Sequence, residues 1–486
     1  MKILQVAAEA VPYAKTGGLA DVAGALPKAL RGIGVESDLI LPFYRDVERS
    51  RLSFQGSPEE ISVWFGDREE SGVVEEVRDA GGGSVFLVRN DKYFDREFLY
   101  GTRDGDYGDN CERFAFFCRG VIDWILRSGR RYDVIHCHDW QTALIPVYLK
   151  TLYADVEPLA SVASVFTVHN LGYQGLFYDH DLPITGLGWD LFTHKGLEFY
   201  GRVNLMKGGL VFGDILSTVS ETYSREIQKE EFGYGLEGVL YERRGELFGI
   251  VNGADYDEWN PATDRWIKTN YSAYDLSGKA DCRKDLLAEF GFPDGDDFIV
   301  GIIGRFTSQK GFDLIERAGD WLAGQPLRLI IIGSGERRYE ESITELGRRY
   351  PERVAVRVTY DTALAHKIEA GMDACLMPSR YEPCGLNQIY SLKYGTVPIV
   401  RNTGGLADTV VDADMYPGNG NGFIFNEYSP EALKGAVSRA LAAFTDRPRW
   451  KTIIRRGMEE DFSWDSSARR YVDLYEKAVQ KKRSKR

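Results

Sequence analysis

Residues 298–311 read FIVGIIGRFTSQKG, and this stretch decides the fold prediction. Six mostly apolar residues are followed by a glycine and a polar loop, which is typical of a buried parallel strand that leads into a helix. Strand-length apolar runs followed by a turn and a helical pattern recur at 3–6, 85–88, 134–135, 164–168 and 329–332. The series starts at residue 2 and again near residue 298. The sequence therefore predicts an α/β protein with two doubly wound domains.

The boundary between the two series is less regular. Residues 241–295 carry several turn signals, so we place the hinge near residue 248. The predicted domains are 1–248 and 249–464, followed by a segment 465–486 that combines a helix with a basic tail.

The composition argues against a nucleic-acid-binding protein and against a membrane-spanning one. The chain has 486 residues, 43% apolar and 27% charged, with 60 Lys and Arg against 73 Asp and Glu and a net charge of -13. The one basic run is Lys481–Arg486, which argues against nucleic acid as a partner. No apolar run approaches the roughly 20 residues of a membrane helix. The six cysteines form no CxxC pair, so we expect free thiols and a cytoplasmic protein.

Two glycine loops echo each other. Residues 15–22 read KTGGLADV and residues 402–409 read NTGGLADT. A Gly-Gly step before a helix exposes backbone N–H groups to an anion, and Lys15 adds a cation, so we favour a phosphate site over a plain turn there. One such loop in each half fits two domains that face each other across a cleft and bind ligands at the carboxyl ends of their strands.

Three further positions follow predicted strands. Arg305 and Lys310 could neutralise a departing diphosphate, although a surface loop could also carry both cations. Glu382 lies in a rigid turn with Pro383 and Gly385, where its carboxylate could bind sugar hydroxyls or support positive charge, or equally interact with a helix N-terminus. Gly385 could offer a further N–H.

Three histidines, His136, His138 and His169, are candidates for metal ligands or catalytic groups. Alternation places His136 and His138 on one face, which could be half of a metal site, but no third ligand follows at usable spacing. His169 ends a predicted strand, where a lone histidine is more often structural. The Gly333-Ser334-Gly335 fingerprint is incomplete, and neither a P-loop nor a GxSxG elbow is found, which disfavours dehydrogenases, P-loop enzymes and α/β-hydrolases.

Together these stretches resemble the glycogen and starch synthases, retaining glucosyltransferases that use a nucleotide-diphosphate glucose. Seven motifs carry the resemblance in order: 15–22, 136–140, 167–170, 252–253, 304–311, 379–388 and 403–408. The resemblance implies a GT-B fold of two Rossmann-like domains that close over ADP-glucose and lengthen an α-1,4-glucan. It implies no metal and no pyridoxal phosphate.

The resemblance also assigns roles by position. It implies that Lys15, Arg305 and Lys310 hold the diphosphate, that Glu382 binds glucose hydroxyls and that the backbone carbonyl of His169 faces the anomeric carbon. Backbone N–H groups would come from Gly18, Gly404 and Gly405, and Tyr360 would pack on adenine. The remaining substrate contacts would be Gly17, Asp21, Asp139, Asn170, Asn252, Cys384, Gly385, Leu386 and Thr403.

The resemblance leaves the ribose contact, the donor base and the acceptor open. Many retaining GT-B enzymes carry a glutamate where this chain has Tyr390, so the ribose contact is unassigned. The final helix, with Tyr471, Leu474 and Tyr475 at near-helical spacing, is expected to return to the first domain. UDP-glucose as donor, a lipid or protein acceptor, and a non-catalytic glucan-binding scaffold are the alternatives, and the oligomeric state is not predicted.

Overall fold

The computed structural model describes residues 1–79, 81–102, 105–359 and 361–484. The chain forms two compact units: unit 1 is Met1–Gly253 with Trp464–Arg486, and unit 2 is Ala254–Ser463. The predicted hinge at residue 248 lies five residues before this boundary. The difference arises because strand β14 (Leu247–Gly249) still pairs with the sheet of unit 1.

Among the described residues, unit 1 contains a nine-stranded sheet in the order β14-β13-β9-β8-β1-β2-β5-β4-β3. The strands from β14 to β5 run parallel, whereas β4 and β3 form an antiparallel hairpin at one edge. This hairpin was not predicted, because its alternating and largely polar residues lack the apolar run of a buried strand. The remaining bounds are β1 (Lys2–Val6), β2 (Glu36–Pro42), β3 (Phe54–Phe65), β4 (Arg68–Arg78), β5 (Ser84–Arg89), β8 (Val134–His138), β9 (Ala163–Val168) and β13 (Ile215–Thr218).

Helices cover this sheet, and short hairpins decorate its connections. Helix α3 is buried along most of its length, including every residue from Arg113 to Cys118, and it is followed by Gly129, whose φ of 65° terminates the helix in the left-handed region. The helices of unit 1 are α1 (Gly18–Gly32), α2 (Asp91–Phe94), α3 (Asn110–Ser128), α4 (Leu144–Lys150), α5 (Leu205–Phe212), α6 (Glu221–Glu226), α7 (Glu230–Gly233), α8 (Glu237–Glu242) and α17 (Trp464–Ser484). The minor strands are β6 (Gly101–Thr102), β7 (Gly105–Asp106), β10 (Leu176–Tyr178), β11 (Glu198–Phe199) and β12 (Arg202–Asn204).

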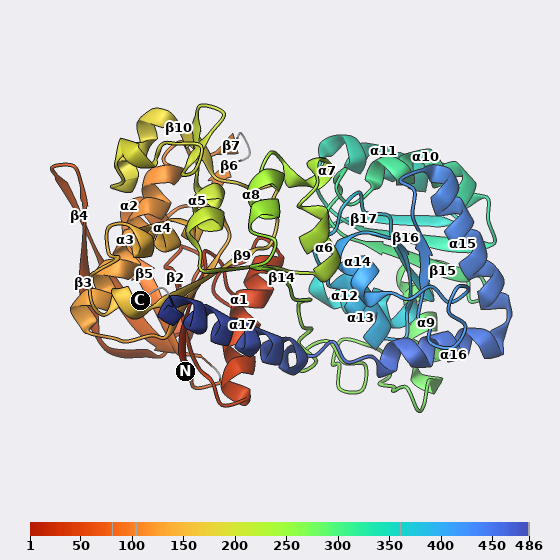
Figure 1. Ribbon diagram of the computed structural model, residues 1–486. Helices are drawn as coiled ribbons and strands as arrows, with labels where there is room; N and C mark the ends of the chain where they lie inside the picture. The colour runs from red at the N-terminus through yellow and green to blue at the C-terminus, as the bar shows by residue number, and fades with distance from the viewer. Residues whose placement is uncertain (80, 103–104, 360, 485–486) are drawn as a thin grey trace. The chain divides into compact units, whose positions relative to one another are not determined.

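Helix α17 belongs to unit 1 although it follows all of unit 2 in the chain. It lies beside α1 (Figure 1) and contacts strands β8, β9 and β13. Its buried residues are spaced by three and four positions, which gives the helix one apolar stripe. This stripe shares a core with Val22, Leu26 and Leu30 of α1, and it consists of Trp464, Ala468, Tyr471, Leu474, Tyr475 and Ala478.

Unit 2 contains, within the residues described, a six-stranded parallel sheet in the order β17-β16-β15-β18-β19-β20. Val300 of β15 packs into one core and its neighbour Ile299 into another, so both faces of the sheet are buried as predicted. The strands are β15 (Phe298–Ile303), β16 (Leu327–Gly333), β17 (Val354–Val358), β18 (Ala374–Met377), β19 (Val397–Arg401) and β20 (Phe423–Phe425). The helices are α9 (Ser277–Glu289), α10 (Phe312–Ala323), α11 (Arg337–Arg349), α12 (Thr362–Gly371), α13 (Asn387–Lys393), α14 (Gly404–Thr409), α15 (Pro430–Thr445) and α16 (Arg447–Glu459).

The stretch 241–295, expected to be irregular, contains helix α9 as well as β14. The helix buries Cys282 and Leu286, four residues apart, but it also buries Lys279 and exposes two alanines, Ala280 and Ala288. So few apolar positions give a weak periodic signal in the sequence.

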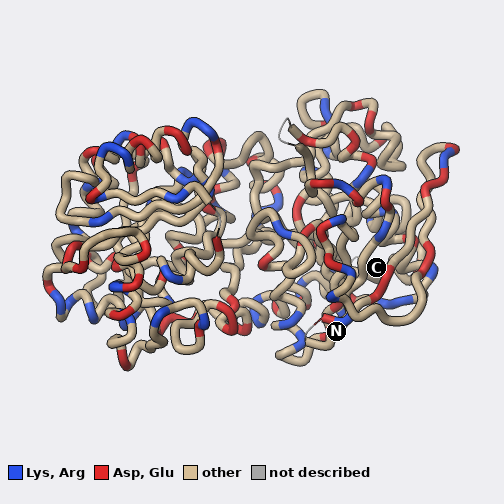
Figure 2. The backbone as a smooth tube through the Cα atoms, turned by 180° about the vertical axis from the view of Figure 1, so that it is seen from behind, with Lys and Arg blue, Asp and Glu red and all other residues tan. Residues whose placement is uncertain are grey.

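Charge is mixed over each unit. Figure 2 shows Lys and Arg interspersed with Asp and Glu along the described backbone of both units, rather than gathered into one basic stripe. The described helices include none that is long and apolar enough to cross a membrane.

Candidate active site

The predicted site residues of unit 1 follow three neighbouring parallel strands. Asp139 comes directly after β8, and His169 directly after β9, while the loop 7–17 joins β1 to α1. Strands β9, β8 and β1 are adjacent in the sheet. Their carboxyl ends therefore lie at one edge, which is where doubly wound sheets bind ligands.

The first glycine loop is open. Lys15 Nζ lies 2.7 Å from Asp21 Oδ1, and the two side chains are 44% and 28% exposed. Gly18 is the first residue of α1 and is exposed. A Cβ built at Gly17 or Gly18 would meet nothing within 4 Å in the described part of the chain. A helix N-terminus with an adjacent cation can receive an anion here.

Glu9 completes this loop, and sequence reasoning missed it. Its carboxylate is 3% exposed and accepts hydrogen bonds from the Thr16 hydroxyl at 2.6 Å, the Gly17 N–H at 3.3 Å and the Tyr100 hydroxyl at 2.6 Å. The N–H of Gly17 is thus engaged by protein, while Gly18 starts the helix beside it. The available signal was a single carboxylate within the otherwise apolar stretch 6–14.

Asp139 orients the backbone of His169. The Asp139 backbone has a φ of 57°, and its Oδ1 accepts from the His169 N–H at 2.7 Å. Burial raises the pKa of the Asp139 carboxyl to about 7, against the opposing effect of this hydrogen bond. Such a residue can hold the peptide unit at 169 in a fixed position.

The three histidines at this edge are buried and hydrogen-bonded to one another or to neutral groups. His169 Nε2 lies 3.0 Å from His138 Nδ1, and His138 Nε2 lies 3.0 Å from Gln5 Oε1. His136 contacts Tyr475 through Nδ1 and Thr167 through Nε2. Burial lowers the pKa of His169 to about 3 and holds those of His136 and His138 well below the ordinary value. Both ring nitrogens of His136 and His138 are engaged, which accounts for the pair without a metal.

The predicted site residues of unit 2 also follow neighbouring parallel strands. The loop 304–311 follows β15, the loop 378–386 follows β18 and the loop 402–403 follows β19, and these three strands are adjacent. Arg380 N–H donates to the Gln309 carbonyl at 2.8 Å, which ties the first two loops together. The sequence-predicted segments therefore meet at one edge of the second sheet.

Lys310 and Glu382 form the central pair of this edge. Lys310 Nζ lies 2.6 Å from Glu382 Oε2, and the Ser379 hydroxyl donates to the same oxygen at 2.9 Å. The Glu382 side chain is 6% exposed and that of Lys310 24%. Arg305 is exposed and forms no ion pair with any residue that the structure describes. The edge thus combines a buried carboxylate with two cations.

The second glycine loop is closed, which corrects one prediction. The Gly405 N–H donates to the Glu382 carbonyl at 3.0 Å, so it is not available to a phosphate. A Cβ at Gly404, where φ is 45°, would lie 1.8 Å from the Glu382 carbonyl oxygen, and one at Gly405 would lie 2.1 Å from that of Cys384. Both glycines are needed for close backbone approach, and this packing positions Glu382.

The other predicted residues lie at the two edges. Asn252 is buried, and its Oδ1 has no hydrogen-bond partner among the described residues, whereas Asn170 Oδ1 accepts from the Gly172 N–H at 3.0 Å. Gly385 has a φ of 74° and precedes Leu386, the N-cap of α13. Cys384 and Thr403 are buried beside them. Tyr360, predicted to pack on adenine, lies outside the described residues.

Tyr390 occupies the position where many related folds carry a second glutamate. Its ring stacks on Trp259 at a centroid distance of 4.1 Å and an interplanar angle of 6°. Trp259 stacks on His366 in turn, at 3.8 Å. Tyr390 therefore contributes to an aromatic stack in unit 2, and the ribose contact stays unassigned.

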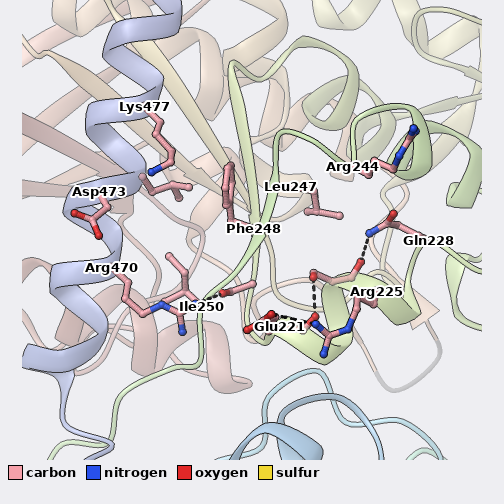
Figure 3. Close-up of a pocket in the computed structure, with 13 residues that line it drawn as sticks. Glu221, Arg225, Gln228, Arg244, Leu247, Phe248, Ile250, Arg470, Asp473 and Lys477 are labelled. Carbon is pink, nitrogen blue, oxygen red and sulfur yellow. Dashed lines mark hydrogen bonds and ion pairs between the residues drawn. The ribbon is translucent and has the colours of Figure 1, made fainter.

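A separate pocket of about 440 Å³ lies in unit 1, between α6, β14 and α17 (Figure 3). Its three arginines are engaged by protein groups: Arg470 donates to the Gly249 carbonyl at 2.9 Å, Arg244 donates to the Tyr241 carbonyl at 2.8 Å, and Arg225 pairs with Glu221 at 3.1 Å. It contains none of the predicted site residues. Its lining instead shows how α17 is fastened to the edge strand.

Comparison with known proteins covers nearly the whole chain. Residues 2–242 match the family described as starch synthase catalytic domain, and residues 284–456 match glycosyl transferases group 1. A glycogen synthase of Koribacter versatilis is 50% identical over 99% of both chains, and one of Geotalea daltonii is 46% identical over 99% of this chain and 100% of the relative.

Solved structures agree with these sequence matches. The catalytic domain of starch synthase IV from Arabidopsis thaliana, bound to ADP and acarbose, superposes with a TM-score of 0.90 at 33% identity and covers 99% of both chains. A sucrose-phosphate synthase from Thermosynechococcus elongatus gives 0.60 at 18% identity over 98% of both chains, which shows the fold alone.

Proposed function

The chain belongs to the family of glycogen and starch synthases, which are GT-B glycosyltransferases, and we propose that it transfers glucose from ADP-glucose to the 4-hydroxyl at the non-reducing end of an α-1,4-glucan, with retention of the anomeric configuration. The observation that carries this proposal is the 50% identity to a glycogen synthase over 99% of the chain. The structural likeness to a starch synthase solved with ADP supports an adenine nucleotide as donor.

Three cations are assigned to the leaving group. Lys15, next to the open N-terminus of α1, and Arg305 and Lys310, at the edge of the second sheet, would bind the diphosphate and stabilise the charge that develops as it departs. Positive charge supplied by side chains is the reason we propose a reaction without a metal ion or pyridoxal phosphate. Full activity in the presence of a chelator would agree with this.

Glu382 is assigned to the glucose. Its contacts with Lys310 and Ser379 both involve Oε2, so Oε1 can accept from sugar hydroxyls without loss of the ion pair. The close packing of the 404–405 backbone against residues 382–384 would keep this carboxylate in place. A rigid support of this kind serves catalysis by positioning.

The His169 carbonyl is assigned to the reacting carbon. The Asp139 carboxylate accepts from the His169 N–H and also hydrogen-bonds the backbone of Asn170, whose N–H shares a peptide unit with the His169 carbonyl. Asp139 can therefore orient that carbonyl toward a carbon that gains positive charge. The bond between C1 and the phosphate oxygen breaks while the acceptor 4-oxygen attacks C1 from the same face. The acceptor proton passes to the leaving phosphate oxygen, so no covalent enzyme intermediate is required.

Three alternatives lead to different outcomes in one experiment, in which labelled glucose is offered as ADP-glucose and as UDP-glucose with glycogen as acceptor. We expect incorporation from ADP-glucose in the wild type and its loss in Glu382→Ala. Incorporation from UDP-glucose alone would overturn the donor. Glycogen binding without incorporation from either would favour the non-catalytic scaffold, and transfer to a lipid or protein but not to glycogen would replace the acceptor.

The proposal places the enzyme in the cytoplasm, where thiols stay reduced. All six cysteines are described residues, and each is buried and outside any disulfide.

A further inference from the structure

A buried row of hydrogen bonds runs from helix α17 to His169. Gln5 Nε2 donates to the Tyr475 hydroxyl at 3.0 Å, and Gln5 Oε1 lies 3.0 Å from His138 Nε2. His138 Nδ1 lies 3.0 Å from His169 Nε2. Gln5, His138 and Tyr475 are 0% exposed, and His169 is 8% exposed. The row crosses neighbouring strands β1, β8 and β9 and ends at the candidate active site.

The row fixes which nitrogen of His169 carries the proton. Because the Gln5 amide nitrogen faces Tyr475, its Oε1 accepts from His138 Nε2–H. His138 Nδ1 then accepts from His169 Nε2–H. This leaves His169 Nδ1 as an acceptor, and that atom is buried with no partner among the described residues. Turning the Gln5 amide over would reverse each donor, so the tautomer depends on how Gln5 is held.

Tyr475 is well placed to hold Gln5. Helix α17 is anchored at one end by Ser467, whose hydroxyl donates to the Val251 carbonyl at 2.7 Å, and by Arg470, which donates to the Gly249 carbonyl (Figure 3). The Tyr475 hydroxyl also lies 2.9 Å from His136 Nδ1, which accepts the hydroxyl proton when His136 carries its own proton on Nε2. A row of polar groups buried in an apolar core adopts one geometry, because a buried group that loses its hydrogen-bond partner lowers the stability of the fold.

We propose that Tyr475, Gln5 and His138 are positioning residues, and that α17 sets the tautomer and orientation of the His169 imidazole through this row. The inference rests on the proposed function, in which His169 lies at the reacting carbon. It gives the returning helix a role in the chemistry of the site in addition to its role in packing.

The direct test is nitrogen-15 NMR of protein labelled at histidine, which resolves imidazole tautomers and has only six histidines to assign. The variants are Tyr475→Phe and, as matched control, Tyr148→Phe, which removes another buried hydroxyl, one that donates to the Thr185 carbonyl at 2.6 Å. We expect one neutral Nε2–H tautomer of His169 in the wild type and in the control. In Tyr475→Phe we expect that signal to shift or to split into two tautomers.

Kinetics provide a second readout. Tyr475→Phe should lower kcat for glucosyl transfer about tenfold, with KM for ADP-glucose changed less than twofold, whereas Tyr148→Phe should retain kcat within twofold. If Tyr475 acts through His138, adding Tyr475→Phe to His138→Asn should slow the enzyme by less than twofold further.

An unchanged His169 signal in Tyr475→Phe would overturn the proposal, as would independent and multiplicative rate losses in the double variant. The NMR experiment needs no substrate. A wild-type protein that shows the expected tautomer but transfers no glucose would therefore contradict the proposed function and leave the positioning row intact.

Discussion

The two Thr-Gly-Gly loops, 16–18 in unit 1 and 403–405 in unit 2, share a sequence and each lead into a helix, yet they serve different purposes. In unit 1 the glycines face open space, and Lys15 lies next to them. In unit 2 the glycines lie against the backbone carbonyls of residues 382 and 384. The same three residues thus form an open loop in one unit and a close backbone contact in the other.

The Lys–carboxylate pair of unit 1 is also more exposed than that of unit 2. Lys15 and Asp21 are largely exposed, whereas Lys310 and Glu382 are mostly buried and share Ser379. Exposed pairs contribute little to stability, while breaking a buried pair leaves a charge without compensation. Unit 1 thus holds its cation in an exposed pair, whereas unit 2 builds its cation into the fold.

The largest effect is expected at Gly404. Replacing Gly404 by Ala would place a Cβ 1.8 Å from the Glu382 carbonyl oxygen at a φ of 45°, so we expect the free energy of unfolding to fall by about 2–5 kcal/mol. Gly18→Ala is the matched change in the open loop and should alter it by less than about 0.5 kcal/mol. Urea unfolding of both variants checks this. Equal losses would remove the distinction between the loops.

The next effect separates rate from stability. Lys15→Ala and Lys310→Ala should each lower kcat by about 10²–10³. Lys310→Ala should also reduce the free energy of unfolding by about 1–3 kcal/mol, because Glu382 loses its partner. Adding Glu382→Gln to Lys310→Ala should restore stability but not the rate. Rate losses below threefold in both lysine variants would contradict the leaving-group assignment.

The third effect is acid sensitivity of unit 1. Between its native pKa of about 3 and its ordinary value of 6.5, His169 binds more protons unfolded than folded, so its contribution to stability falls as pH drops through that window. His136 and His138 act in the same direction. Asp139, with a native pKa of about 7, acts in the opposite direction between that value and its ordinary 3.8.

Below pH 6.5, each of these buried imidazoles lowers the free energy of unfolding by about 1.4 kcal/mol for every pH unit of acidification. The three histidines together therefore outweigh the opposing effect of Asp139. In unit 2, burial raises the pKa of Glu369 to about 8, so the contribution of this residue to stability grows as the pH falls below that value. Pulse proteolysis in urea at pH 7 and pH 5.5, with fragments identified by mass spectrometry, should show unit 1 opening first at the lower pH. Loss of unit 2 before unit 1 would contradict this.

The smallest effect is expected at Asp21. Asp21→Asn removes an exposed ion pair and should change the free energy of unfolding by less than about 1 kcal/mol, with even that difference reduced in high salt. The same substitution removes one contact of Lys15, so a change in kcat with unchanged stability reports on the site and not on folding. A large loss of stability would show that the two ion pairs are more alike than their exposure indicates.

Local sequence patterns were sufficient for the parallel strands and for the loops that follow them. The apolar runs at 298–303 and 329–332 correspond to β15 and β16, and Gly18 and Gly404 each begin a helix. These features depend on residues that are close in the chain. The positions of these residues directly after predicted strands were therefore sufficient to predict that they lie at the carboxyl edge of each sheet.

Features that depend on distant residues were not predictable. Gln5 meets Tyr475 across 470 positions, and the carboxylate of Glu9 meets the Tyr100 hydroxyl across 91. The closed state of the second glycine loop depends on carbonyls about 20 residues away, so the expectation that the Gly405 N–H is free was wrong. No pattern within a window of a helix or strand carries this information.

The return of helix α17 to unit 1 has a consequence for how the protein is made. Unit 2 is one continuous segment and can fold as soon as it leaves the ribosome, but unit 1 must wait for a helix that is translated after it. Until then Gln5 and His136 lack the Tyr475 hydroxyl, and the face of the sheet that α17 shares with α1 is only partly covered. A nascent chain halted before residue 464 would therefore hold a finished second unit and an unfinished first one.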